Sequence, residues 1–140
     1  MEDGLREYYL AMIPKVESQD ARVLFEKLAV IEIKHQERIL AEYGSITATT
    51  VNRETFVANE VIPAVEGGLT TEEYVSLYNP DLESAAEIIS LAMAIEAQAL
   101  DLYRRAAEKS DNEESKKVLL QIADEERVHL TQLGKLFENL

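Results

Sequence analysis

The chain has 140 residues and a mass of 15.8 kDa, which is enough for one domain with a hydrophobic core. Its formal net charge of −13 argues against nucleic acid or an anionic membrane as a partner. Cysteine is absent, which excludes disulfides, iron–sulfur clusters and thiolate zinc sites. Few aromatic residues and abundant Ala, Leu, Ile and Glu favour an all-helical protein.

The N-terminal residues lack a basic region followed by an apolar stretch, so the sequence predicts no secretory signal. Every long apolar run is broken by Glu or Lys before it reaches the length needed to cross a bilayer. We therefore expect a soluble, cytoplasmic protein.

Apolar residues recur in steps of three and four over four segments, which predicts four amphipathic helices. These segments cover about residues 2–17, 19–43, 83–109 and 112–138. Pro14 is expected to kink or end the first helix, and Asp111 or Asn112 to cap the fourth. Only a few residues join the first helix to the second and the third to the fourth, and short joints make antiparallel hairpins.

Residues 44–82 form a long connection that crosses the bundle between the two hairpins. Within it, residues 54–62 predict a short helix ended by Pro63. Residues 71–78 predict another, ended by Asn79-Pro80. We therefore expect one all-α domain over residues 1–140.

Both histidines of the chain follow a glutamate by three residues, in Glu32-x-x-His35 and Glu126-x-x-His129. On a helix, this spacing places the carboxylate and the imidazole on one face, where both can reach a single metal ion. The two units are 94 residues apart. The same offset relates two further pairs of residues, Glu2 with Glu96 and Tyr9 with Tyr103.

The helical seams are apolar except at six positions: Glu2, Glu32, His35, Glu96, Glu126 and His129. Four charged, unpaired carboxylates inside a bundle would each cost several kcal/mol. Two divalent ions would cancel their four charges, and this residue set is the one found in carboxylate-bridged dinuclear sites of four-helix bundles. The alternative is a duplicated helical hairpin with exposed glutamates.

Three neighbouring residues are open to more than one interpretation. Glu125 is the alternative ligand to Glu126, but it falls off the seam and is expected to be solvated. Tyr9 and Tyr103 are expected to pack in the seam with their hydroxyls bonded to a ligand carboxylate, or to act catalytically as redox groups or proton donors.

Three stretches carry a resemblance to a known family: residues 94–103, residues 25–35 and residues 124–129. They include the sequences Ala-Ile-Glu, Phe-Glu-Lys-Leu-Ala and Asp-Glu-Glu-x-x-His. In these stretches the chain resembles the rubrerythrin branch of the ferritin-like superfamily, over both hairpins. The resemblance implies a ferritin-like four-helix bundle with a di-iron centre. By analogy Glu32 and Glu126 would bridge the two metals, and Glu2 and Glu96 would be terminal ligands beside His35 and His129.

The chain also departs from the family pattern. Rubrerythrins proper carry a Cys₄ iron domain, and this chain has no cysteine, so an external protein would donate electrons. Ala99 stands where rubrerythrins have an additional glutamate, so we expect a more symmetric site without a redox-linked iron shift. Glu2 has one residue before it and is expected to lie on a frayed first turn.

We expect a redox enzyme that reduces hydrogen peroxide or O₂ at two iron ions, with zinc or manganese as possible substitutes. The alternatives are a ferroxidase or iron-handling protein of ferritin type and a non-catalytic, metal-stabilised interaction module. A second apolar stripe on the second helix, formed by Val23, Val30 and Ile33, favours a homodimer. The long connection also permits exchange of hairpins between subunits.

Overall fold

The computed structural model describes residues 1–47 and 69–140, and all regular structure in these ranges is helical. The helices are α1 (Glu2–Met12), α2 (Gln19–Thr47), α4 (Thr71–Tyr78), α5 (Ala85–Lys109) and α6 (Glu113–Glu138). The predicted helix over residues 54–62 lies outside the described residues. Within these ranges, no helix is both long and apolar enough to cross a membrane.

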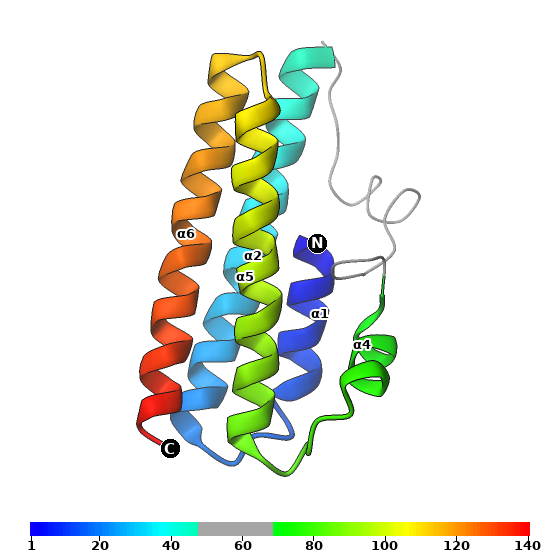
Figure 1. Cartoon of the computed structure of the whole chain (residues 1–140), viewed down its shortest axis with the longest axis vertical. Helices are drawn as coiled ribbons and strands as arrows, with labels where there is room; N and C mark the ends of the chain where they lie inside the picture. The colour runs from blue at the N-terminus through cyan, green and yellow to red at the C-terminus, as the bar shows by residue number, and fades with distance from the viewer. Residues whose placement is uncertain (48–68) are drawn as a thin grey trace.

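The long helices α2, α5 and α6 run side by side along the main axis of the molecule (Figure 1). The short helix α1 covers only part of their length, and its N-terminus lies near the middle of the bundle (Figure 1). The most extensive packing is between α5 and α6 and between α1 and α2, which are the two hairpins. Packing of α2 on α6 and of α1 on α5 joins them, so the predicted all-α four-helix bundle of two hairpins is confirmed.

Helix α1 ends earlier than predicted, at Met12 instead of near residue 17. Pro14 has no N–H to continue the helical ladder, and its ring clashes with the preceding turn. The chain leaves the helix through a turn in which the N–H groups of Lys15 and Val16 donate to the carbonyl of Met12. Val16 is nevertheless buried, so the seam continues beyond the helix itself.

The starts of α5 and α6 are fixed by side-chain caps. Ser84 accepts a hydrogen bond from the backbone N–H of Glu87 at the start of α5. Asn112 accepts from two backbone N–H groups at the start of α6, as one of the two predicted caps.

The short helix α4 has the bounds predicted from the sequence. Thr70 and Glu73 form a reciprocal capping box at its start. Asn79 adopts a left-handed conformation (φ 44°) at its end, directly before Pro80. Tyr74 is buried and packs α4 into the core that it shares with α1.

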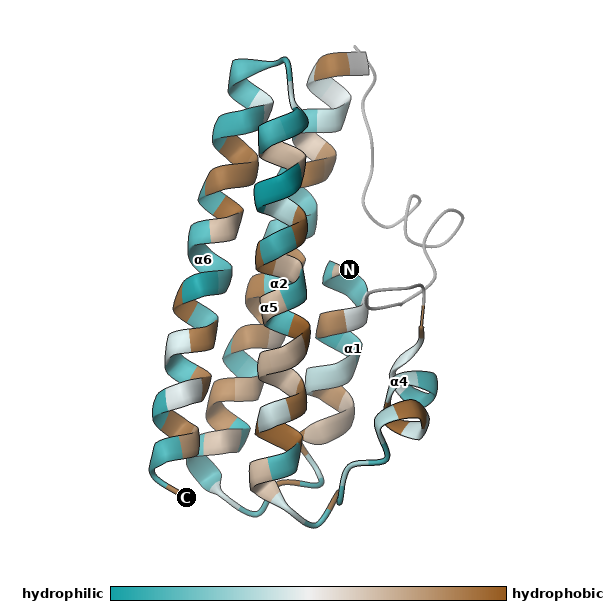
Figure 2. Cartoon of the chain, in the orientation of Figure 1, coloured by the Kyte–Doolittle hydropathy of each residue, from teal (hydrophilic) through white to brown (hydrophobic). Residues whose placement is uncertain are grey.

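The long helices are amphipathic, with hydrophilic residues beside hydrophobic ones along each of them (Figure 2). The buried apolar side chains form one cluster, and its largest members include Leu5, Tyr8, Tyr9, Phe25, Leu28 and Ile122. Burial of each such side chain stabilises the fold by roughly 1.5–3 kcal/mol. The polar residues that share this interior form the site described next.

Candidate metal centre

The four bundle helices each contribute to a buried cluster of carboxylates and imidazoles. The contributions are Glu2 from α1, Glu32 and His35 from α2, Glu96 from α5, and Glu126 and His129 from α6. None of the six is more than 4 % exposed. The structure therefore brings together all six residues that the sequence predicts as metal ligands.

The six residues form two overlapping groups in which the possible ligand atoms lie within 4.8 Å of one another. The first group is Glu2, Glu32, His35 and Glu126, and the second is Glu32, Glu96, Glu126 and His129. Glu32 and Glu126, one from each hairpin, are common to both groups. A carboxylate with one oxygen in each of two neighbouring ligand sets is placed to bridge two cations.

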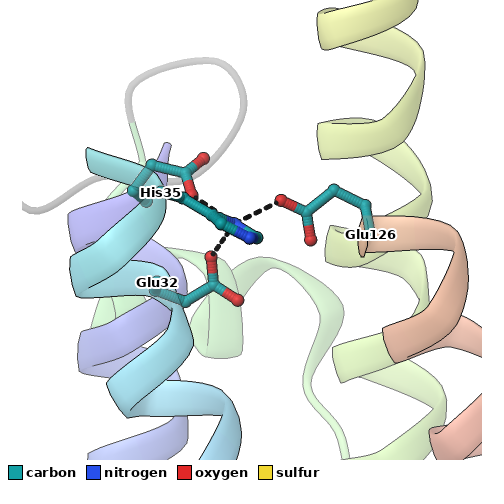
Figure 3. Close-up of side chains that lie close together, drawn as sticks. Glu32, His35 and Glu126 are labelled. Atoms are coloured by element: carbon teal, nitrogen blue, oxygen red, sulfur yellow. Dashed lines mark hydrogen bonds and ion pairs between the residues drawn. The ribbon is translucent and has the colours of Figure 1, made fainter. Parts of the chain in front are cut away.

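His35 directs Nδ1 into the cluster (Figure 3). This atom lies 2.9 Å from Glu126 Oε1 and 3.2 Å from an oxygen of Glu32. It is also 3.2 Å from Glu2 Oε2. The α2 imidazole is therefore surrounded by carboxylates from three helices.

His129 repeats this arrangement from the other hairpin. Its Nδ1 lies 2.9 Å from Glu126 Oε2 and 3.4 Å from oxygens of Glu32 and Glu96. The rings of His35 and His129 are nearly parallel, at an angle of 14°, with their centres 5.5 Å apart. Both imidazoles thus present the same nitrogen to the two shared carboxylates.

The shared carboxylates have the geometry of metal ligands rather than of hydrogen-bond acceptors. All four oxygens of Glu32 and Glu126 are buried without a hydrogen-bond partner in the described structure, although histidine nitrogens approach Glu126 to 2.9 Å. The distances from the histidine nitrogens to the Glu126 oxygens are short, but the angles at these contacts are not those of hydrogen bonds. Ligand atoms about 2.1 Å from one ion lie roughly 3.0–3.4 Å from each other, which is the spacing seen here. The residues therefore fit a pair of divalent ions.

In the absence of metal, protons compensate the buried charges. Burial raises the pKa of Glu96 to about 8 and the pKa of Glu32 well above its usual value. Burial also disfavours the charged forms of Glu126 and His129, but their interactions outweigh it. The two histidines hold the pKa of Glu126 at about 2, and Glu126 and Glu96 raise the pKa of His129 to about 9.

The two tyrosines connect the hairpins through the outer carboxylates. The Tyr9 hydroxyl on α1 donates to Glu96 on α5, and the Tyr103 hydroxyl on α5 donates to Glu2 on α1. Burial, reinforced by the nearby carboxylates, raises the pKa of both tyrosines well above the usual value. Both hydroxyls therefore remain protonated donors within the cluster.

Glu2 does not lie on a frayed turn, contrary to the sequence prediction. It is 4 % exposed in the first turn of α1, where it accepts from Tyr103 and approaches His35 Nδ1. Leu5, one turn later, is fully buried and anchors that turn to the core. The packing of Leu5 and the hydrogen bond from Tyr103 therefore hold the first turn of α1 in place, although the first turn of a helix commonly frays.

Sequence analysis missed the roles of Glu125 and Arg38. Glu125 was expected to be solvated, yet its Oε2 lies 2.9 Å from His35 Nε2. Both terminal nitrogens of Arg38 donate to the same carboxylate, each at 2.9 Å. The side chain of Glu125 is 45 % exposed. Partial burial raises the pKa of its carboxyl group, but the hydrogen bonds and charges of Arg38 and His35 outweigh burial, so the pKa is lowered overall. A carboxylate that accepts from Nε2 leaves Nδ1 free for a metal.

Two comparisons relate the chain to known proteins. Residues 87–140, which cover most of α5 and all of α6, match the rubrerythrin family model. A stretch of 58 residues is 38 % identical to the ferritin-like-encapsulin shell fusion protein of Pyrococcus furiosus. That stretch is 41 % of this chain and 17 % of the length of the relative. No solved structure matches the chain.

Proposed function

We propose that this chain is a rubrerythrin-like protein of the ferritin-like superfamily, which holds two iron ions at its carboxylate–histidine site and reduces hydrogen peroxide or O₂. The observation that carries the proposal is the pair of ligand groups with two carboxylates in common, buried inside the bundle. Two iron ions held there would supply one electron each to a two-electron oxidant.

Under this proposal Glu32 and Glu126 take the positions shared between the metals, and Glu2 and Glu96 the outer positions. Carboxylate and imidazole ligands suit iron or manganese, and zinc can occupy the same ligand set. Tyr9 and Tyr103 hold protons at the outer carboxylates and exclude water from them. Reduction of one peroxide to two waters consumes two electrons and two protons, and the electrons return from a donor protein external to these 140 residues.

Stopped-flow mixing of anaerobic, Fe²⁺-loaded protein with hydrogen peroxide tests the proposal. We expect about two Fe²⁺ per chain to be oxidised faster than free Fe²⁺ under the same conditions. Glu126→Gln should abolish this advantage, because it removes the charge of a shared ligand. Asp124→Asn is the matched control, since Asp124 is exposed and, among the described residues, forms an ion pair with Arg127 alone. Oxidation at the rate of free Fe²⁺ in the parent protein would refute peroxide reduction.

The name of the Pyrococcus relative supports a second candidate, a ferroxidase that handles iron. That name joins a ferritin-like part to an encapsulin shell. A ferroxidase would oxidise many Fe²⁺ per chain with O₂ and show no sustained peroxide turnover when an electron donor is supplied. Storage of iron by the chain alone would also require a large hollow assembly, which gel filtration would detect.

We also propose that the chain forms a homodimer through α2. Val23 and Val30 are 53 % and 54 % exposed on that helix, one above the other at a spacing of two turns. Analytical ultracentrifugation of the parent protein and of Val30→Glu tests this surface. The variant should be monomeric at concentrations where the parent is dimeric, and a monomeric parent would contradict the proposal.

A further inference from the structure

A pocket of about 470 Å³ opens between α2 and α6 beside the second ligand group. Its lining includes Lys27, Ile31, Lys34, Arg38, His129 and Gln132. One water takes up roughly 30 Å³ in the liquid, so the pocket has room for a small polyatomic ligand with its hydration. No side chain assigned to the metal site other than His129 lines it.

His129 leaves one ring nitrogen unused at this pocket. Its side chain is 3 % exposed and its Nδ1 faces the glutamates of the cluster. No residue in the described part of the chain hydrogen-bonds to its Nε2. The corresponding nitrogen of His35 is bonded to Glu125. Because His129 lines the pocket and its Nε2 has no acceptor among the described residues, a ligand in the pocket is placed to accept that N–H.

The internal repeat shows which side chains are missing. The 94-residue offset that relates the ligands also relates Ile31 to Glu125 and Arg38 to Gln132. Ile31 therefore stands in the pocket where the other half of the repeat has a carboxylate. Glu125 is held by a cation from α2, Arg38, and at His129 the uncharged Gln132 stands in the place of that cation.

The pocket at His129 has cations without a carboxylate partner of their own. Lys27 and Lys34 are exposed and form no ion pair with any described residue. They stand two turns apart on α2, on either side of Ile31, so both can reach one ligand. The only carboxylate in the lining, Glu125, is already engaged by Arg38 and His35.

We propose that this pocket binds a small oxyanion, a phosphate or a carboxylate, which accepts a hydrogen bond from His129 Nε2 and pairs with Lys27 and Lys34. The anion does for His129 what Glu125 does for His35. The inference does not rest on the proposed redox reaction, because His129 Nε2 and the lysines are present whether or not the protein turns over an oxidant.

The charge of the whole chain opposes this binding and sets its salt dependence. At −13 the protein repels anions at long range, but charges separated by more than about 8 Å are screened at physiological ionic strength. The two lysines and the imidazole N–H act within hydrogen-bond distance of the ligand, where they are not screened in this way. We therefore expect saturable binding that weakens as ionic strength rises.

Because the chain has only two histidines, NMR of ¹⁵N-histidine-labelled protein can test the proposal directly. The full chain is titrated with inorganic phosphate and, in a separate experiment, with acetate. Each titration is carried out on the metal-free protein and on protein loaded with diamagnetic Zn²⁺. We expect the Nε2 signal of His129 to shift saturably while that of His35 stays in place. Preference for phosphate or acetate identifies which oxyanion the pocket favours. Shifts of both histidines that appear only with zinc would place the anion on the metal and overturn the proposal.

Two variants at the pocket separate specific binding from general charge effects. Lys34→Gln should weaken phosphate binding about tenfold, the loss expected for one charge-assisted hydrogen bond. Lys117→Gln, which makes the same charge change on the exposed surface of α6, should leave the affinity unchanged. Equal affinity in these two variants, or no saturable shift in the parent, would refute the site.

A third variant restores the missing carboxylate. Ile31→Glu should place a carboxylate beside His129 Nε2 and abolish the response to phosphate, whereas Ile31→Gln, of similar size but uncharged, should retain part of it. A full phosphate response in Ile31→Glu would show that the anion binds elsewhere.

Discussion

Glu125 and Arg38 fix the orientation and tautomer of His35. The carboxylate accepts from Nε2 and is itself held by both terminal nitrogens of Arg38, so the imidazole presents Nδ1 to the cluster. His129 presents the same atom without such support from the described residues. The inner ligand set is thus symmetric, while its surroundings are not.

Glu125→Gln should weaken binding of one of the two metal ions by about 10- to 100-fold, the usual effect of losing a partner of a ligand histidine. The amide keeps the size of the side chain but loses the charge that Arg38 and His35 share. Competition titration with a chromophoric chelator measures both affinities. Asp124→Asn controls for net charge, and an equal loss at both metals would contradict the assignment to His35.

Tyr103→Phe should lower the free energy of unfolding of the metal-free protein by about 1–3 kcal/mol, because a buried carboxylate oxygen of Glu2 loses its donor. The ring and its packing are retained. Chemical denaturation measures the difference. Tyr78→Phe, which removes an exposed hydroxyl, should have an effect near zero, and equal effects of the two substitutions would rule out a specific bond.

At the scale of elements, α1 is the least extensive helix of the bundle, with 11 residues against 29 in α2. Isolated helices of this length are marginal in water, so packing and not intrinsic propensity must hold α1 in place. Its buried residues lie on the face that carries Glu2. The position of one predicted ligand therefore depends on the apolar contacts of a short helix.

Leu5→Ala should destabilise the protein by about 2–5 kcal/mol, as for other fully buried leucines, and should weaken metal binding at Glu2. Leu10→Ala on the same helix is the matched control. Leu10 is 41 % exposed, so this substitution should lower the free energy of unfolding much less than Leu5→Ala. Thermal denaturation and metal titration of both variants test this dependence. Metal affinity that is unchanged in a destabilised Leu5→Ala would show that α1 does not position the ligand.

At the scale of the whole molecule, protons and metal ions compete for the same buried charges. His129, with its pKa raised from 6.5 to about 9, and Glu96, raised from 4.5 to about 8, bind protons more tightly in the folded state. Their contribution to stability is complete below the unfolded pKa values and is lost as pH rises through 8 and 9. Glu126, lowered to about 2, contributes above pH 4.5 and loses its contribution as pH falls towards 2.

The metal-free protein should therefore melt at its highest temperature near pH 5 and at progressively lower temperatures up to pH 9. The stabilisation by added Zn²⁺ or Fe²⁺ should increase over the same range, because metal binding displaces protons from the ligands. Thermal melts with a chelator and with metal at each pH measure both trends. His129→Gln should flatten the metal-free curve, and a parent curve that is already flat would contradict this charge compensation.

Much of the fold could be predicted because its determinants are local. The period of apolar residues predicted the long helices, and turn residues such as Asn79-Pro80 predicted the bounds of α4. Pro14 was identified as a helix-ending residue, but the earlier end of α1 was not, since buried Val16 continues the apolar pattern beyond the helix.

The sequence by itself determined the helical seams, the six polar positions within them and the repeat that relates the two hairpins. These features depend on residue type and on spacing along one helix, which fix the face that a side chain occupies. The tertiary structure alone decided which carboxylate each tyrosine hydroxyl and the Nε2 of His35 contact. The bonds from Tyr9 to Glu96, from Tyr103 to Glu2 and from His35 to Glu125 depend on the distance and rotation between packed helices, which no local pattern encodes.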